Sequence, residues 1–191
     1  MKILIICRSQ EETQSVSSIC NKHKHPDLSI IYMTIGTGIC DVSMKMTQYF
    51  ERTPETQLPD YIIKVGTCQS FDKCVQGSEF VTSASKLFSS NTNSWVFHDI
   101  IATDRLPEKR ISSGDEYMIS IPNDTKGTQL YDNETAAISR VCAFYEYIGF
   151  FSYHVVSDVI EWYNDKFEIN NNTFKTLPDI IRDIYSAQHN F

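Results

Sequence analysis

The sequence predicts an α/β protein, a three-layer α/β/α arrangement around a central mixed sheet. Short apolar runs typical of buried strands alternate with stretches whose apolar residues recur at helical spacing. Such alternation favours helices packed on both faces of a sheet. The run Phe150–Ser157 is almost continuously apolar, which is typical of a strand inside the sheet. Because no internal repeat or linker-like segment interrupts the pattern, we expect one domain over residues 1–191.

The first half of the chain begins with a strand and contains a clear amphipathic helix, in which Val42, Met46 and Phe50 share one face. Its predicted elements, in order, are strand Lys2–Ile6, a short helix entered through Arg8–Glu12, strand Leu28–Met33, a tight turn at Gly36–Gly38, helix Asp41–Glu51, a polar spacer Arg52–Pro59, and strand Tyr61–Val65 ending in Gly66 and Thr67.

The second half contains the main helix, which we expect Asp132 to cap and Gly149 to terminate. The other predicted elements, in order, are strand Glu79–Ala84, a Ser/Asn-rich loop Ser85–Asn93, strand Trp95–Ala102, a turn Ser112–Asp115, strand Glu116–Ile121, strand Phe150–Ser157, a loop Asn170–Asn172, and an amphipathic helix Thr176–Ala187.

Composition excludes several classes of protein. Because the net charge is −7, the chain has no net positive charge to attract the phosphates of a nucleic acid, so we expect no nucleic-acid partner. No apolar run approaches bilayer length, and Ile3–Cys7 is too short for the core of a signal peptide, so we expect a soluble cytoplasmic protein that does not bind membranes. The six cysteines include no C-x-x-C pair, which indicates reduced thiols, no metal site and no cofactor.

Two acidic residues lie at positions that should be close together at one edge of the sheet. Glu134 lies where the main helix begins, and Asp158 follows the buried strand about twenty residues later. Ligands of open α/β sheets bind outside the carboxyl ends of the strands. Two carboxyl groups at that edge can hold a sugar and protonate a leaving group. This pattern therefore predicts a site that cleaves nucleosides.

The order of these segments resembles the nucleoside phosphorylase and nucleosidase superfamily, and most closely the methylthioadenosine/S-adenosylhomocysteine nucleosidases. The resemblance covers almost the whole chain, from Met1 to about Trp162. It rests on five places, which are Met1–Ile6 followed by Glu11-Glu12, Gly36-Thr37-Gly38, Lys64-Val65-Gly66-Thr67-Cys68, Ser113-Gly114-Asp115-Glu116-Tyr117-Met118, and Asn133-Glu134-Thr135 with Ser157-Asp158.

The resemblance implies a role for each of these positions. Asp158, beside Ser157, would donate a proton to a purine ring nitrogen, and Glu134 would accept hydrogen bonds from ribose hydroxyl groups. Glu12 would take the proton from the attacking water. The other substrate-binding positions implied by the resemblance are Asn133, Tyr117, Met118, Gly66 and Thr67, with the ring of Tyr117 stacking on the base. The family also implies at least a homodimer, in which one subunit covers the mouth of its neighbour's pocket.

The same residues also have purely structural interpretations. An acid such as Glu134 is favoured in the first turn of a helix by the helix dipole alone, and Asp158 could cap a following helix. Glu12 next to Glu11 could be a solvated surface pair, and Tyr117 an ordinary core residue.

Two of the chain's departures from the family pattern concern the pocket. Asn133 replaces the methionine that packs under the ribose, and Cys68-Gln69-Ser70 replaces small residues, which predicts a narrower or differently hydrogen-bonded base pocket.

Three functions stay open. The first is a nucleosidase. The second is a phosphorylase that binds phosphate at Arg8, Lys64, Thr67 and Gly38, although Lys64 cannot make the forked contact of an arginine. The third is a protein that binds a nucleoside without turnover.

Overall fold

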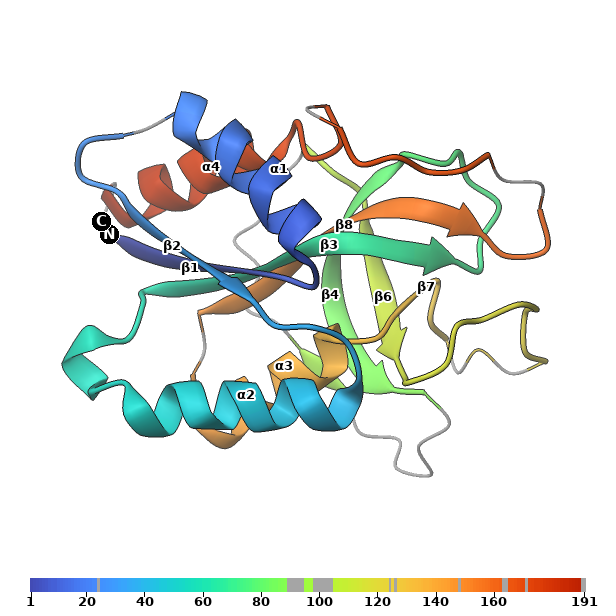
Figure 1. Ribbon diagram of the computed structural model, residues 1–191, viewed down its shortest axis with the longest axis horizontal. Coiled ribbons are helices and arrows are strands. Elements are labelled where there is room, and N and C mark those ends of the chain that lie inside the picture. Colours follow the sequence, from blue (N-terminus) through green and yellow to red (C-terminus); the bar gives the residue numbers. More distant parts are fainter. Residues whose placement is uncertain are drawn as a thin grey trace.

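The computed structural model describes residues 1–23, 25–88, 95–97, 105–123, 125, 127–147, 149–162, 165–170 and 172–189. Within these ranges the chain forms three layers, a twisted mixed sheet between two pairs of helices (Figure 1). The strands are β1 Lys2–Cys7, β2 Ser29–Thr34, β3 Tyr61–Ser70, β4 Glu79–Leu87, β5 Val96–Phe97, β6 Glu108–Ser113, β7 Leu130–Asp132 and β8 Phe150–Val159. The helices are α1 Gln10–Lys22, α2 Ile39–Arg52, α3 Thr135–Phe144 and α4 Leu177–His189, with a 3₁₀ turn at Glu55–Gln57. The predicted fold class is confirmed.

The sheet is open at one end and closed at the other. Strands β2, β1, β3 and β8 pair side by side and all run parallel. Strand β8 then pairs antiparallel with β4, β4 and β7 both pair in parallel with β6, and β7 returns antiparallel to β3. Together with the pairing of β3 and β8, these four pairings close β3, β8, β4, β6 and β7 into a ring. Closure leaves these strands without a free edge and gathers the ends of β3, β7 and β8 in one place.

Alternation along β1 explains the layers. Ile3 and Ile5 pack with α1 and α4 on one face of the sheet, whereas Leu4 and Ile6 pack with α2 and α3 on the other. All four side chains are buried, and full burial of each contributes on the order of 2 kcal/mol. Figure 1 shows α1 and α4 above the sheet and α2 and α3 below it. The periodicity that predicted the α2 face is confirmed, since Val42, Met46 and Phe50 are its buried residues.

Several predicted boundaries were wrong. Residues Glu116–Ile121 do not form a strand, because this segment runs past the closed end of the sheet and exposes Tyr117 and Ile119. Residues Ser85–Leu87 belong to β4 rather than to a loop, because they pair with β6. Of the predicted strand Trp95–Ala102, only residues 95–97 lie among the described residues, and the short strand β5 covers two of them. Residues 89–93 of the predicted loop, and Asn171, lie outside the described part.

Two other boundaries moved in ways that matter for the site. Strand β3 continues through Gly66 and Thr67 to Ser70, because β8 pairs with it over this whole length. The main helix ends at Phe144, one turn earlier than predicted. In the part of the chain that the structure describes, no helix combines the length and apolar character needed to cross a bilayer.

Candidate active site

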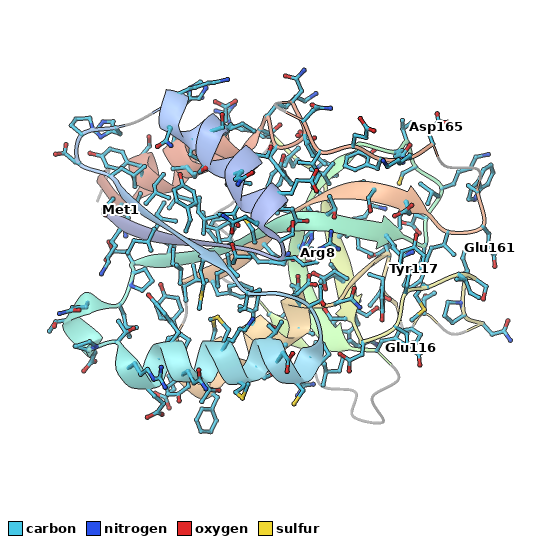
Figure 2. All side chains as sticks on the ribbon, viewed as in Figure 1. Met1, Arg8, Glu116, Tyr117, Glu161 and Asp165 are labelled. Atoms are coloured by element: carbon cyan, nitrogen blue, oxygen red, sulfur yellow. The ribbon has the colours of Figure 1, made fainter. Side chains whose placement is uncertain are left out.

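A cavity of about 480 Å³ opens at the carboxyl ends of β3 and β8. It is bounded by the ends of these strands, by the segments around residues 117 and 131–133, and by residues 165–169. Its lining residues are Arg8, Glu11, Thr67, Cys68, Gln69, Tyr117, Tyr131, Asp132, Asn133, Ser157, Asp158, Asp165, Lys166, Phe167 and Ile169. Figure 2 shows Arg8 and Tyr117 beside the carboxyl-terminal half of β3, with Asp165 on the loop that follows β8. The predicted residues Arg8, Thr67, Tyr117, Asn133, Ser157 and Asp158 therefore share one cavity.

Glu12 lies in the first turn of α1, and its carboxylate is completely buried beneath this cavity. Its Oε2 accepts the Arg8 backbone N–H at 2.9 Å, and its Oε1 accepts both the backbone N–H and the hydroxyl of Thr67 at 3.1 Å. Burial by itself raises the pKa of Glu12, but nearby Lys64 and Arg8, together with these hydrogen bonds, outweigh burial and lower it. Glu12 is thus held ionised and is not a solvated surface residue.

Lys64 projects from β3 into the same interior and is fully buried. Its Nζ lies 3.4 Å from Glu134 Oε2 and 3.4 Å from the carbonyl oxygen of Val65. Burial favours the neutral amine, but Glu134 and Glu12 outweigh it and raise the pKa of Lys64. The missing side chain of Gly66 makes this arrangement possible, since a Cβ there would collide with Lys64 Nζ and crowd both oxygens of Glu12. Gly66 therefore leaves room for the side chains of Lys64 and Glu12, and it does not line the cavity.

Glu134 immediately precedes α3 and is as completely buried as Glu12. The helix does not need its side chain as a cap, because Asp132 accepts the backbone N–H of Thr135 at 3.1 Å. Both oxygens of Glu134 lack a hydrogen-bond partner within the described residues. Burial raises the pKa of Glu134 to about 7, with Lys64 opposing and Asp132 reinforcing this shift. A buried carboxylate that has the Lys64 ammonium beside it but accepts no hydrogen bond is costly, so its oxygens are suited to accept hydroxyl groups of a ligand.

Asp158 lies near the end of β8 and lines the cavity. The Ser157 hydroxyl lies 2.9 Å from Asp158 Oδ2, and the Tyr117 hydroxyl is hydrogen-bonded to Asp158 and Gln69. Burial and the neighbouring Asp158 raise the pKa of Tyr117, so its phenol stays protonated and donates. Although Tyr117 takes part in this contact, 64% of its surface is exposed, which excludes an ordinary core role.

Two further predicted residues, Gly38 and Met118, lie outside the cavity lining, as do Glu12, Glu134, Lys64 and Gly66. Gly38 precedes α2 with φ +94°, and the adjacent Ile39 N–H is bonded to Asp115 at 2.6 Å. It therefore helps to dock the Ser113-Gly114-Asp115 turn against a helix. Met118 lies behind Gln69, whose carboxamide bonds both its backbone N–H and its carbonyl. Asn133 lines the cavity, but its amide is bonded to the carbonyl oxygen of Gly114.

Sequence reasoning assigned no site role to several residues that the structure brings here. Gln69 was noted only as a departure from the family pattern, and nothing in the sequence indicated that residues 165–169 would fold back over the cavity. His154 is fully buried on β8, and its Nε2 lies 3.4 Å from the Thr135 hydroxyl. Burial lowers the pKa of His154 to about 4, so its ring is neutral at pH 7. No cluster of three or more His, Cys, Asp or Glu suited to a metal ion occurs in the described ranges.

No protein-family model matches the chain, and no curated protein sequence matches it. Solved structures do match, and the chain shares the fold of methylthioadenosine nucleosidases.

Three of these structures span nearly the same length as this chain. The methylthioadenosine/S-adenosylhomocysteine nucleosidase of Helicobacter pylori, solved with butyl-thio-DADMe-Immucillin-A, has a TM-score of 0.72 at 13% identity, covering 98% of each chain. A futalosine hydrolase mutant of H. pylori has a TM-score of 0.72 at 12% identity, covering 98% of this chain and 99% of that one. The nucleosidase of Colwellia psychrerythraea, in complex with adenine, has a TM-score of 0.69 at 15% identity, covering 96% and 89%. At these identities the likeness establishes the fold.

Proposed function

We propose that this protein is a nucleosidase that hydrolyses the N-glycosidic bond of a purine nucleoside. The observation that carries the proposal is a cavity lined by Asp158 together with Arg8 and Thr67, the two residues that hydrogen-bond the buried Glu12, with Glu134 buried beside Lys64. Each of the three acids has a different environment, and cleavage of this bond requires three different tasks. The similarity of the fold to solved nucleosidases supports the same function.

The three tasks follow from the chemistry of the bond. As the bond between C1′ and the base nitrogen breaks, its electron pair moves to the base and positive charge develops on the ribose. Asp158 passes a proton to a ring nitrogen of the departing base. Glu134 accepts the ribose hydroxyl groups and stabilises the cation-like sugar. Glu12 takes a proton from water while the water oxygen bonds to C1′, so the products are a free base and a free sugar.

Hydrolysis is favoured over phosphorolysis by the charges around the cavity. Arg8 Nη2 already lies 3.3 Å from Glu12 Oε1, and Lys64 is buried against Glu134. A phosphate dianion would therefore approach cations that carboxylates already neutralise, and Glu12 itself would repel it. The Thr67 hydroxyl is likewise engaged by Glu12. For this reason we keep the phosphorylase only as an outcome of the test.

Product analysis distinguishes the possibilities. The protein is incubated with methylthioadenosine, adenosine, inosine and uridine, each with and without inorganic phosphate. Free base and free sugar in the absence of phosphate support the proposal. A sugar 1-phosphate that forms only when phosphate is added would replace it with a phosphorylase, and binding without turnover would replace it with a non-catalytic nucleoside-binding protein.

The proposal includes assembly into a homodimer or larger homo-oligomer. Tyr117 lines the cavity while being 64% exposed, and nearby Ile119 on the same segment is 85% exposed. Apolar side chains at the mouth of a pocket are suited to a covering subunit. Light scattering coupled to size-exclusion chromatography measures the mass, and a strictly monomeric protein at working concentration would contradict this part of the proposal.

A further inference from the structure

The carboxamide of Gln69 occupies an unusual place on the cavity wall. Gln69 lies just after the irregularity in the pairing of β3 with β8 and is the register partner of Asp158. Its Oε1 accepts the Met118 backbone N–H at 3.0 Å, and its Nε2 donates to the Met118 carbonyl oxygen at 2.9 Å. The two bonds form a closed, two-point pair. Gln69 is 6% exposed and lines the cavity, whereas Met118 behind it does not.

The backbone groups of Met118 that pair with Gln69 have the hydrogen-bonding pattern needed to pair with the edge of a nucleobase. An N–H beside a carbonyl oxygen offers one donor and one acceptor in a plane. The carboxamide of Gln69 is complementary to this pair, since its oxygen accepts one hydrogen bond and its nitrogen donates the other. Adenine presents the same pattern through N1 as acceptor and its 6-amino group as donor, whereas hypoxanthine presents the two in reverse order, with N1–H as donor and O6 as acceptor. Unsubstituted purine has the acceptor but no adjacent donor.

We propose that Gln69 is a specificity-determining residue that substitutes for the nucleobase edge, so that a 6-substituted purine must displace its carboxamide to reach the backbone of Met118. This inference rests on the proposed function for the location of the base, next to Asp158 and Tyr117. The Tyr117 hydroxyl contacts both Asp158 and Gln69, and Tyr117 is next to Met118 in the sequence, so the segment 117–118 brings both residues to Gln69. Competition from the Gln69 carboxamide lowers the affinity for every base that uses this edge, whereas a base without the donor can replace only one of the two hydrogen bonds when it displaces Gln69.

The expected effect follows from the two hydrogen bonds that the ligand must replace. Together the two bonds contribute about 1–3 kcal/mol net, so removing the competitor should tighten adenine binding by roughly 5- to 150-fold. The gain should be much smaller for unsubstituted purine. If Gln69 were instead a scaffold for the loop, its removal would loosen the site and weaken the binding of both bases.

The test measures base binding directly, by titration calorimetry of adenine and of unsubstituted purine. Gln69→Ala removes the carboxamide, and Gln69→Asn keeps an amide that is one methylene too short to reach both groups. Gln129→Ala is the matched control, since the Gln129 side chain accepts the Arg110 N–H at 2.9 Å outside the cavity lining. Tighter adenine binding in both Gln69 variants, with purine and the control near wild type, supports the inference. Unchanged or weaker adenine binding overturns it.

Labelling with ¹⁵N-methionine locates the contact, because the chain has five methionines and Met118→Leu identifies the relevant signal. In Gln69→Ala, adenine should shift the Met118 amide at lower concentration than in the wild type, and a signal insensitive to adenine contradicts the inference. The outcomes for the two proposals are separate. Hydrolysis by the wild type without tighter adenine binding in the variants removes only the inference, whereas tighter binding without hydrolysis removes only the proposed function.

Discussion

Glu12 and Glu134 are a natural comparison, since both are completely buried beside Lys64 but differ in ionisation. Glu12 receives two backbone N–H groups and a hydroxyl, and its pKa is lowered. Glu134 receives no hydrogen bond from the residues described, and burial raises its pKa to about 7. The difference shows that neighbouring charges and hydrogen-bond donors, rather than depth, decide the charge of these acids, since Lys64 and Arg8 lower the pKa of Glu12 and Asp132 raises that of Glu134. In the proposed function, Glu12 is already ionised and can act as a base, while Glu134 receives hydrogen bonds from the hydroxyl groups of the ligand.

The largest expected effect comes from removing an acid that takes part in the chemistry. Glu12→Gln keeps the size of the side chain and loses the proton acceptor, so kcat should fall by roughly 10²- to 10⁴-fold. Asp158→Asn should cause a loss of similar size. Steady-state assays of free base release measure both. Glu55→Gln, in the exposed 3₁₀ turn, is the control for a neutralised glutamate. Retention of most activity by Glu12→Gln would contradict its role as base.

Removing the shared cation should damage stability more than any other single change at the site. Lys64→Met leaves Glu12 and Glu134 buried without their common partner, and breaking such a pair costs about 3–5 kcal/mol. Chemical denaturation measures the loss. Adding Glu134→Gln to Lys64→Met should restore part of it, because one uncompensated charge disappears. If the double variant is no more stable than Lys64→Met, the two side chains are not coupled.

The raised pKa of Glu134 predicts a pH dependence of stability. The folded-state value of about 7 exceeds the ordinary 4.5, so the folded protein binds the proton more tightly than the unfolded chain. The contribution of this group to stability is therefore complete below pH 4.5 and is lost as pH rises through 7, by on the order of 3 kcal/mol. Urea unfolding between pH 5 and 8 measures the slope, and Glu134→Gln should flatten it. An equal slope in the variant would assign the dependence to other groups.

The smallest expected effect concerns Gly66, the glycine beside Lys64 and Glu12. Gly66→Ala brings a methyl group against Lys64 Nζ and both oxygens of Glu12. Crowding of this kind costs about 1–3 kcal/mol, and it should also displace Glu12 and reduce activity. Thermal unfolding and initial rates measure the two effects together. A stable, fully active Gly66→Ala would show that Lys64 can move aside without consequence.

Much of the fold could be predicted from the sequence because local patterns determine it. The continuous apolar run of β1 predicts a strand buried on both faces, and the spacing of Val42, Met46 and Phe50 predicts which face of α2 is buried. Boundaries set by distant pairing could not be predicted in this way. Strand β3 extends past Gly66 only because β8 runs beside it, and Glu116–Ile121 has strand-like residues but no partner strand among the described residues.

The site was predicted in part, for the same reason. Resemblance placed Glu12, Glu134 and Asp158 together, and the structure puts Asp158 at the cavity and both glutamates beneath it. The burial of Lys64 between two acids and the pairing of Gln69 with Met118 depend on contacts across 70 and 49 positions of the chain. Periodicity and capping preferences carry no information about such contacts.

Site-specific ¹³C labelling of glutamate, with Glu12→Gln and Glu134→Gln to assign the signals, tests the central claim most directly. The carboxyl titrations are followed without ligand and with a C-nucleoside, whose carbon–carbon glycosidic bond is not cleaved. The predicted result is an ionised Glu12 throughout and a Glu134 that titrates at about 7, moving lower when ribose hydroxyl groups bind it. Identical titrations of the two acids, or a Glu134 signal that the nucleoside leaves unchanged, would contradict the account.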